Sequence, residues 1–347
     1  MTRALISNAP IGESVPSRPV DMTADLAGIS LPSPVMTASG CAAAGRELDQ
    51  FFDITRLGAI VTKSVMLEPR SGRATPRMAE TPSGMLNSIG LQGPGIDAFI
   101  EKDLAWLHER GARTIVSIAG STVDEYARLA SRLRSVPGIA GIEVNISCPN
   151  VANRGLVFAC EAGSAGDVVQ AVKRNSDPRM PLFAKLSPDV TSIVAIADAV
   201  VRAGATGVSV INTLLGMVIN PDTMRPHLAG VTGGLSGPAV RPVAVRCVWQ
   251  IRQAFPDLPI IGMGGIRTGL DALEFLLAGA NAVSVGTVVF HDPHAPVRIH
   301  DELNVALADR GFDRLVDAVS FAHRPADIPA PQQAREDFGD DFDIITD

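Results

Sequence analysis

The 347-residue sequence has few aromatic side chains and few cysteines. Aromatic residues make up 4% of the chain, so a core must rest on the aliphatic residues within its 46% hydrophobic share. The four cysteines are scattered and form no C-x-x-C pair, which excludes the usual spacings of zinc and iron–sulfur sites, and we expect no metal. So few cysteines in a chain of this length are typical of a reducing compartment, which predicts a cytoplasmic protein.

Clusters of positive charge are missing as well. The net charge is −7 at pH 7 and the basic residues are dispersed, which argues against a nucleic acid or an anionic membrane as a partner. The N-terminus lacks the charged-then-apolar pattern of a signal peptide. One uncharged run, residues 203–221, is about long enough to span a bilayer. Its glycines, asparagines and proline favour a strand followed by a loop instead.

The two ends of the chain differ from the region between them. Residues 1–20 contain three prolines and no periodic pattern, which predicts an extended N-terminal arm. The last residues, "EDFGDDFDIITD", predict a loose acidic tail over 326–347. Residues 21–325 are expected to form one domain.

Eight short apolar runs alternate with amphipathic segments in that domain. The expected strands span residues 34–40, 59–64, 113–120, 141–148, 181–187, 207–213, 259–265 and 282–287, each with a helical stretch after it. Ser121 or Thr122 is placed to cap one helix, and Gly204 to end another. Eight strand–helix units predict an α/β fold, a (β/α)8 TIM barrel, with a doubly wound sheet as the alternative. Long loops follow strands two (65–94) and six (214–237), over the mouth where barrels carry their active sites.

Polar residues stand where these strands end, and in a barrel all of those ends meet at one mouth. They are Ser39, Gly40, Lys63, Ser64, Ser117, Gly120, Asn145, Cys148, Lys185, Asn212, Thr213, Gly264, Gly265, Gly286 and Thr287. Lysines, amides and a thiol without a carboxylate cluster favour an anionic ligand with many hydrogen-bonding edges. The glycines after strands seven and eight would let backbone N–H groups approach a phosphate, although glycines also simply make tight turns.

Three side chains have two readings each. Lys63 and Lys185 lie within apolar strands, where a lysine is costly unless it is paired. They form either a buried salt bridge or a cation beside a cofactor that becomes an anion. Cys148 is either an inert buried cysteine or a general base, because a thiol with a reference pKa of about 8.5 can lose its proton near neutral pH. Cys41, Cys160 and Cys247 lack such a setting and are interpreted as structural.

Six motifs in order across residues 21–310 resemble the class 1 dihydroorotate dehydrogenases. They are "TPSGMLNSIGLQGPG" (81–95), "NISCPN" (145–150), "AKLSP" (184–188), "INTLLGM" (211–217), "GGLSGPAVRP" (233–242) and "IIGMGGI" (260–266). "INTLLGM" and "GGLSGPAVRP" look most like the NAD-linked class 1B group. The resemblance implies an FMN enzyme that oxidises dihydroorotate to orotate in pyrimidine (UMP) biosynthesis.

The resemblance also assigns residues. Cys148 matches the family's catalytic base, which removes a proton from C5 of dihydroorotate while hydride leaves C6 for the flavin. The matched substrate contacts are Lys63, Asn87, Ile89, Gly90, Leu91, Asn145, Asn150, Asn212 and Thr213. The matched FMN contacts are Ser39, Lys63, Ser64, Asn145, Lys185, Gly237, Gly264, Gly265, Gly286 and Thr287. Ser117 departs from the family, which usually has an asparagine at the flavin there.

Class 1B enzymes pass electrons to a separate subunit that carries FAD and a [2Fe–2S] cluster. This chain has neither the cysteine spacing for such a cluster nor a G-x-G-x-x-G after a strand, so NAD reduction would require that partner. The family implies a homodimer, alone or within a heterotetramer. Three alternatives remain: an FMN barrel acting on another pyrimidine such as uracil, a fumarate-linked class 1 enzyme, and a non-catalytic barrel that binds a phosphorylated ligand.

Overall fold

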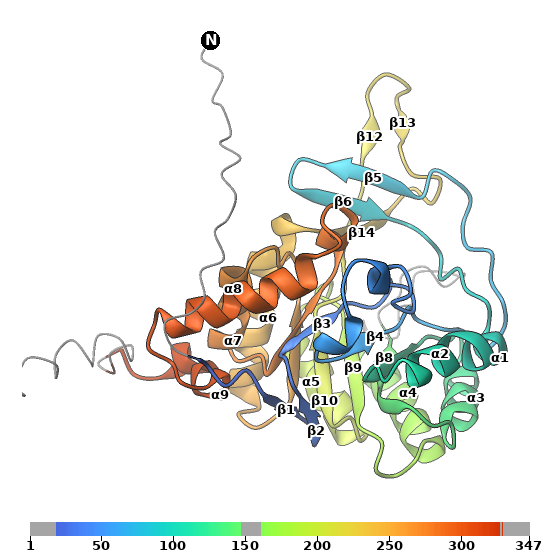
Figure 1. Ribbon diagram of the computed structural model, residues 1–347. Coiled ribbons are helices and arrows are strands. Elements are labelled where there is room, and N and C mark those ends of the chain that lie inside the picture. The colour runs from blue at the N-terminus through green and yellow to red at the C-terminus, as the bar shows by residue number, and fades with distance from the viewer. Residues whose placement is uncertain (1–18, 147–160, 327, 329–347) are drawn as a thin grey trace, which may run out of the picture.

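The computed structural model describes residues 19–146, 161–326 and 328, and within them eight parallel strands form one sheet. Their order is β3–β16–β15–β10–β9–β8–β7–β4 (Figure 1). The strands are β3 Val35–Thr37, β4 Ile60–Val61, β7 Thr114–Ile118, β8 Ile139–Asn145, β9 Leu182–Leu186, β10 Gly207–Val210, β15 Ile260–Met263 and β16 Ala282–Val285. Thr37 closes the ring, because its Oγ1 accepts a hydrogen bond from Val61 N at 2.9 Å and lies 3.3 Å from Val61 O. The predicted (β/α)8 barrel and all eight predicted strands are confirmed.

Helices follow seven of the eight barrel strands. They are the continuous segment α1 Ile96–Ala98, η3 Phe99–Leu104 and α2 Ala105–Glu109, then α3 Val123–Leu133, α4 Ala162–Asn175, α5 Ile193–Arg202, α6 Arg241–Ala254, α7 Gly269–Leu277 and α8 Ala295–Ala308. Thr122 caps α3 by accepting a bond from Glu125 N, and Gly204, with φ 107°, follows the end of α5. The prediction of a helix after the first strand is wrong. Only two 3-10 turns, η1 Leu48–Gln50 and η2 Ile54–Arg56, lie there.

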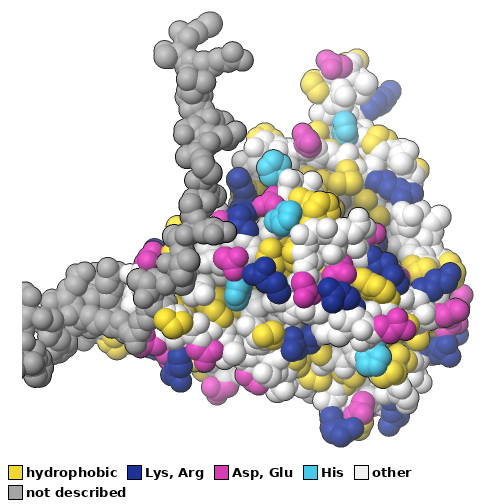
Figure 2. All heavy atoms as spheres, viewed as in Figure 1, with side chains coloured by type: hydrophobic (Ala, Val, Ile, Leu, Met, Phe, Trp, Pro, Cys, Tyr) yellow, Lys and Arg dark blue, Asp and Glu magenta, His cyan; other side chains and the backbone are white. Residues whose placement is uncertain are grey.

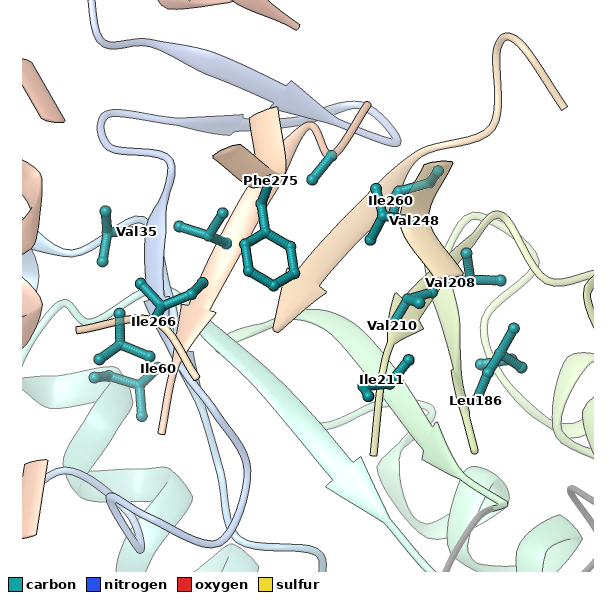
Figure 3. Packing of buried hydrophobic residues seen from close by; sticks show 14 of the residues in the cluster. Val35, Ile60, Leu186, Val208, Val210, Ile211, Val248, Ile260, Ile266 and Phe275 are labelled. Carbon is teal, nitrogen blue, oxygen red and sulfur yellow. The ribbon is translucent and has the colours of Figure 1, made fainter. Parts of the chain in front are cut away.

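The outward side chains of the barrel strands pack against the helices. Val208 and Val210 of β10 and Ile260 of β15 are fully buried, as are Val248 of α6 and Phe275 of α7 (Figure 3). All belong to one apolar cluster. In each barrel strand, the residues that belong to this cluster are alternate ones, and these are the residues that face the helices. The alternate positions must therefore face the barrel interior.

The lower end of the barrel interior is filled by a hairpin of β1 Ala24–Leu26 and β2 Ile29–Leu31 (Figure 1). Leu26 and Leu31 are fully buried in a second apolar cluster with inward-facing residues of the barrel strands, among them Ile115, Phe183 and Ile261. This end is thus a packed core rather than a binding site.

The two long loops meet each other in a second sheet. Its four antiparallel strands follow the order β11–β14–β6–β5, with β5 Met78–Thr81 and β6 Gly84–Asn87 from the first loop, and β11 Leu214–Gly216 and β14 Gly233–Ser236 from the second. The hairpin of β12 Ile219–Asn220 and β13 Arg225–Pro226 projects beyond it (Figure 1). Only long loops were predicted over these two segments, so this sheet is a correction. Within residues 203–221 the predicted strand is β10, whereas β11 and β12 lie in the part that was predicted to be a loop.

The start and end of the described barrel are tied together. Asp21 N donates to Asp313 O, and Leu315 N, at the start of α9 Leu315–Ala318, donates to Asp21 O. The predicted arm and acidic tail fall almost entirely on residues outside the described ranges. Figure 2 shows basic and acidic side chains interspersed over the face seen there. Across the described residues, every helix is too short or too polar to cross a membrane.

Candidate functional site

The upper half of the barrel interior is polar. On β8, Glu143 and Asn145 alternate with Ile142 and Val144, which belong to the helix-side cluster, so both polar side chains point inward. The same alternation turns Ser117 of β7 and Lys185 of β9 inward. All four polar residues are buried. Along β9 the inward-facing side chains therefore change from apolar Phe183 to polar Lys185 at the next inward position.

A buried ion pair lies at the centre of this region. Lys185 Nζ is 3.7 Å from Glu143 Oε1, and the two side chains are 6% and 0% exposed. Lys185 Nζ also donates to Ser39 Oγ at 3.0 Å. Of the two readings of Lys185, the structure therefore contains the salt bridge, and it also joins two of the predicted cofactor residues.

A chain of hydrogen bonds leads from the same carboxylate to the predicted substrate residues. Ser117 Oγ donates to Glu143 Oε1 at 3.0 Å and is 2.9 Å from Ser64 Oγ. Asn145 Nδ2 donates to Ser64 Oγ at 2.9 Å. Asn212 Nδ2 donates to Asn145 Oδ1 at 3.2 Å, and Tyr126 Oη donates to Asn145 O at 2.7 Å. These bonds fix the amide planes of two residues predicted to contact substrate.

Asn87 and Thr213 join this group through the second sheet. Asn87 pairs with Gly234 of β14, and its Nδ2 lies 3.4 Å from Gly234 O. A Cβ atom on Gly234 would lie 2.0 Å from Thr213 Oγ1, so only glycine permits this approach. Thr213 N in turn donates to Asn212 Oδ1 at 2.8 Å. Pairing between the two loops is thus what brings Asn87 to the strand ends.

Three further predicted substrate contacts, Ile89, Gly90 and Leu91, lie on the loop between β6 and α1. Leu91 packs with Met66 and Ala119, which follow β4 and β7 respectively. Lys63 and Ser64 line a cavity of about 120 Å³ together with Gln92, next in sequence to Leu91. Ile89 O accepts a bond from Arg73 N, and Gly90 O accepts one from Arg70 Nε at 2.9 Å. The loop is therefore anchored beside the barrel mouth.

The predicted phosphate glycines lie where other parts of the chain pack closely against the strand ends. A Cβ atom on Gly265, whose φ is 76°, would lie 2.7 Å from Gly237 O, and one on Gly286 would lie 3.3 Å from Ala38 Cβ. Thr287 Oγ1 donates to Ser236 Oγ at 2.8 Å. Gly264, with φ 130°, stands between Met263 and Gly265 at the end of β15. Backbone without side chains at these strand ends, with Lys185 and Ser39 nearby, fits a phosphorylated ring compound such as FMN.

Glu143, Cys41 and Tyr126 were not among the predicted site residues, although Tyr126 bonds to Asn145. Glu143 was visible as an inward position on an apolar strand, but its partner Lys185 is 42 positions away in sequence and only the fold joins them. Cys41, interpreted as purely structural, lies near both lysines. Burial raises the pKa of its thiol, although Lys185 and Lys63 act in the opposite direction. Cys148 and Asn150 lie outside the described residues, as does Cys160.

Similarity to known proteins agrees with this geometry. A family model described as dihydroorotate dehydrogenase matches residues 21–307. The protein named dihydroorotate dehydrogenase B (NAD(+)), catalytic subunit, of Geobacter sp. (strain M21) is 51% identical over 293 residues, covering 84% of this chain and 95% of that protein. The proteins of the same name from Desulforudis audaxviator and Anoxybacillus flavithermus are 52% and 48% identical over 299 and 294 residues. They cover 86% and 85% of this chain, and the matches extend over 96% and 93% of those proteins.

A solved structure shares the fold. The crystal structure of DHODH from Eimeria tenella in complex with ferulenol superposes with a TM-score of 0.74 at 24% identity, covering 88% of this chain and 89% of that one. The chain therefore belongs to the dihydroorotate dehydrogenase family, in its class 1B group.

Proposed function

We propose that this chain oxidises dihydroorotate to orotate as the FMN-binding catalytic subunit of an NAD-linked enzyme in pyrimidine biosynthesis. The observation that carries the proposal is the hydrogen-bonded group at the barrel mouth. It joins Asn145, Asn212 and Thr213 to the Glu143–Lys185 pair. Amides fixed in this way beside a cation suit a ring substrate with several hydrogen-bonding edges better than they suit a phosphate group alone.

FMN would be held by residues from several strand ends of the domain spanning 21–325. They are Ser39, Lys63, Ser64, Asn145, Lys185, Gly237, Gly264, Gly265, Gly286 and Thr287. Bound FMN supplies the hydride acceptor. The cation of Lys185 offers its charge to the electron-rich form of that acceptor, and the glycines leave their N–H groups open to phosphate.

The substrate would lie against the amide group. Asn87, Asn145, Asn150 and Asn212 offer donors and acceptors that match the edges of a pyrimidine ring with a carboxylate, and Lys63 offers a cation to that carboxylate. Cys148, three residues after Asn145, would take the proton from C5. Asn145 is fixed on both its side chain and its carbonyl. The base therefore follows a well-anchored strand end, and alignment of the reacting groups is a large part of such a rate.

Electrons would leave the site through a second protein. The names of the curated relatives describe a catalytic subunit, which implies another subunit, and this sequence lacks the motifs for FAD and [2Fe–2S] binding. We propose a homodimer of this chain within a heterotetramer. The scarcity of cysteine supports a cytoplasmic location.

An absorption spectrum tests the proposed function directly. The purified chain is expected to be yellow, to release FMN and not FAD on denaturation, and to bleach with anaerobic dihydroorotate while reducing NAD poorly. Dihydrouracil and fumarate serve as comparisons. Bleaching by dihydrouracil but not by dihydroorotate would show that the substrate is a different pyrimidine. Rapid turnover with fumarate would show that fumarate is the electron acceptor. A protein that stays colourless after reconstitution with FMN would show that the chain is not a flavoenzyme.

A further inference from the structure

The carboxylate of Glu143 is enclosed in the barrel, and the proposed function gives this residue no role. Its side chain is 0% exposed, and that of its ion-pair partner Lys185 is 6% exposed. A buried ion pair seldom stabilises a protein more than apolar side chains of similar size would. Phe183, one step below Lys185 on the same face of β9, shows that this interior accepts an apolar residue. Packing alone therefore does not explain the pair.

One oxygen of Glu143 contacts two different groups of residues. On the flavin side, Oε1 is 3.7 Å from Lys185 Nζ, which donates to Ser39 Oγ. On the substrate side, the same Oε1 accepts from Ser117 Oγ at 3.0 Å, and Ser117 leads through Ser64 to Asn145. We call these the lysine arm (Lys185 and Ser39) and the serine arm (Ser117, Ser64 and Asn145). Glu143 is the residue at which the two arms join.

We propose that Glu143 is a positioning residue that fixes both halves of the site from one carboxylate. Its charge holds Lys185 in the site and offsets part of the positive charge that this lysine presents to the flavin, and its hydrogen bond orients Asn145 toward the substrate through Ser117 and Ser64. The inference rests on the proposed function, because it is there that Lys185 and Asn145 contact ligands. It also gives Ser117 a task in place of the flavin contact that an asparagine would make.

The two arms can be cut separately. Glu143→Gln keeps the shape and an oxygen that accepts from Ser117, but it removes the negative charge next to Lys185. Reduction adds negative charge to the flavin, so loss of a nearby buried anion should make the flavin easier to reduce. Ser117→Ala keeps the ion pair and removes the hydrogen bond that leads from the carboxylate toward Ser64. That change should loosen Asn145 and leave the charge beside the flavin unchanged.

The experiment measures two equilibria on the FMN-loaded protein. The flavin midpoint potential is determined by equilibration with a reference dye, and the orotate dissociation constant by the change in flavin absorbance. Glu143→Gln should raise the equilibrium constant for reduction about tenfold, or about 30 mV for two electrons, with orotate affinity within about threefold of wild type. Ser117→Ala should weaken orotate binding about fivefold, the value of one hydrogen bond, with little change in potential. Glu143→Asp keeps the charge and should restore the potential.

Ser209→Ala is the matched control. Ser209 is a fully buried serine on β10, in register with Lys185, and among the described residues its hydroxyl has no hydrogen-bond partner. It should change neither equilibrium. Glu143 would be merely structural, and the proposal overturned, if Glu143→Gln left the potential unchanged or if Ser117→Ala bound orotate as wild type does. Should Glu143→Gln fail to fold, Glu143→Asp and Ser117→Ala decide, because a moved potential in the first or unchanged orotate binding in the second contradicts the proposal.

The wild-type protein separates this inference from the proposed function. A wild type that binds FMN but not orotate would refute the substrate, while the potential of Glu143→Gln would still test the lysine arm. A wild type that binds no FMN would overturn both.

Discussion

The lower and upper halves of the barrel interior are built by the same strands and differ in what they contain. Below, Ile115, Phe183 and Ile261 surround the β1–β2 hairpin in a sealed apolar cluster. Above, Ser117, Glu143 and Lys185 form a buried hydrogen-bonded group. On β7 and β9 the change occurs between inward positions only two residues apart. The lower half can thus supply stability, which leaves the upper half free to hold charges that stability alone would not favour.

The largest expected effect tests the upper half by removing the proposed base. Cys148→Ala should slow anaerobic bleaching by dihydroorotate about 10²–10⁴-fold, the usual contribution of a positioned general base, with FMN content unchanged. Stopped-flow absorbance measures the rate. Cys247→Ala is the control, because Cys247 is buried on α6 among helix-side residues and should leave the rate unchanged. Equal rates for Cys148→Ala and wild type would place the base elsewhere.

The next largest effect tests the lower half. Leu26 is fully buried in the hairpin that closes the barrel, and its truncation to alanine leaves a cavity. Leu26→Ala should lower the free energy of unfolding by about 2–5 kcal/mol, measured by urea denaturation. Its orotate dissociation constant at 25 °C should match that of wild type. A variant that kept its stability, or lost orotate affinity while folded, would contradict the division between the two halves.

Local pattern was enough to predict the barrel, because the alternation that buries residues such as Val208 and Val210 is written in each strand. Local pattern was not enough for the second sheet. Asn87 pairs with Gly234, which lies 147 positions later, and short runs such as "GGLS" carry no strong strand signal by themselves. The helix expected after β3 failed because two 3-10 turns suffice to reach β4.

The sequence predicted several of the residues that the structure brings together at the barrel mouth, but not the contacts among them. A lysine within an apolar strand indicated that Lys185 needs a partner, and resemblance indicated a ligand role. Which carboxylate pairs with Lys185 depends on the alignment of β8 with β9, where Asn145 faces Lys185 and Glu143 faces Phe183. That alignment is a property of the sheet rather than of either strand.

A smaller effect in the upper half should come from one amide. Asn212→Ala removes the bond to Asn145 Oδ1 and the acceptor for Thr213 N, so orotate binding should weaken up to about tenfold. Titration of flavin absorbance measures it. Asn175→Ala is the control, since the Asn175 amide bonds only within α4, to Ala171 O. If Asn212→Ala bound orotate as tightly as wild type does, the Asn212 amide would not be part of the substrate site.

The smallest expected effect is a pH dependence of the free energy of unfolding that arises at the lower end of the barrel. Ser33, just before β3, has its Oγ 2.9 Å from His300 Nδ1 and accepts a bond from Val35 N. Burial lowers the pKa of His300 below its usual 6.5, Asp301 opposes this, and Arg56 adds to it. The folded protein then binds fewer protons at His300 than the unfolded chain does. Its free energy of unfolding should therefore fall as the pH drops below about 6.5 and should be insensitive to His300 above that pH.

Urea denaturation of wild type and His300→Gln at pH 5 to 8 isolates this contribution. The difference in unfolding free energy between the two proteins should be constant above about pH 7. Below about pH 6.5 the wild type should lose stability relative to His300→Gln, by at most about 1.4 kcal/mol per pH unit. His300 takes up a proton when the chain unfolds, whereas glutamine does not titrate. Orotate affinity measured over the same range should be the same in both proteins, since His300 contacts the start of β3 and not the ends of the strands. A difference that stayed constant down to pH 5 would show that His300 titrates equally in the folded and unfolded chains, and that its burial against Ser33 does not hold it neutral.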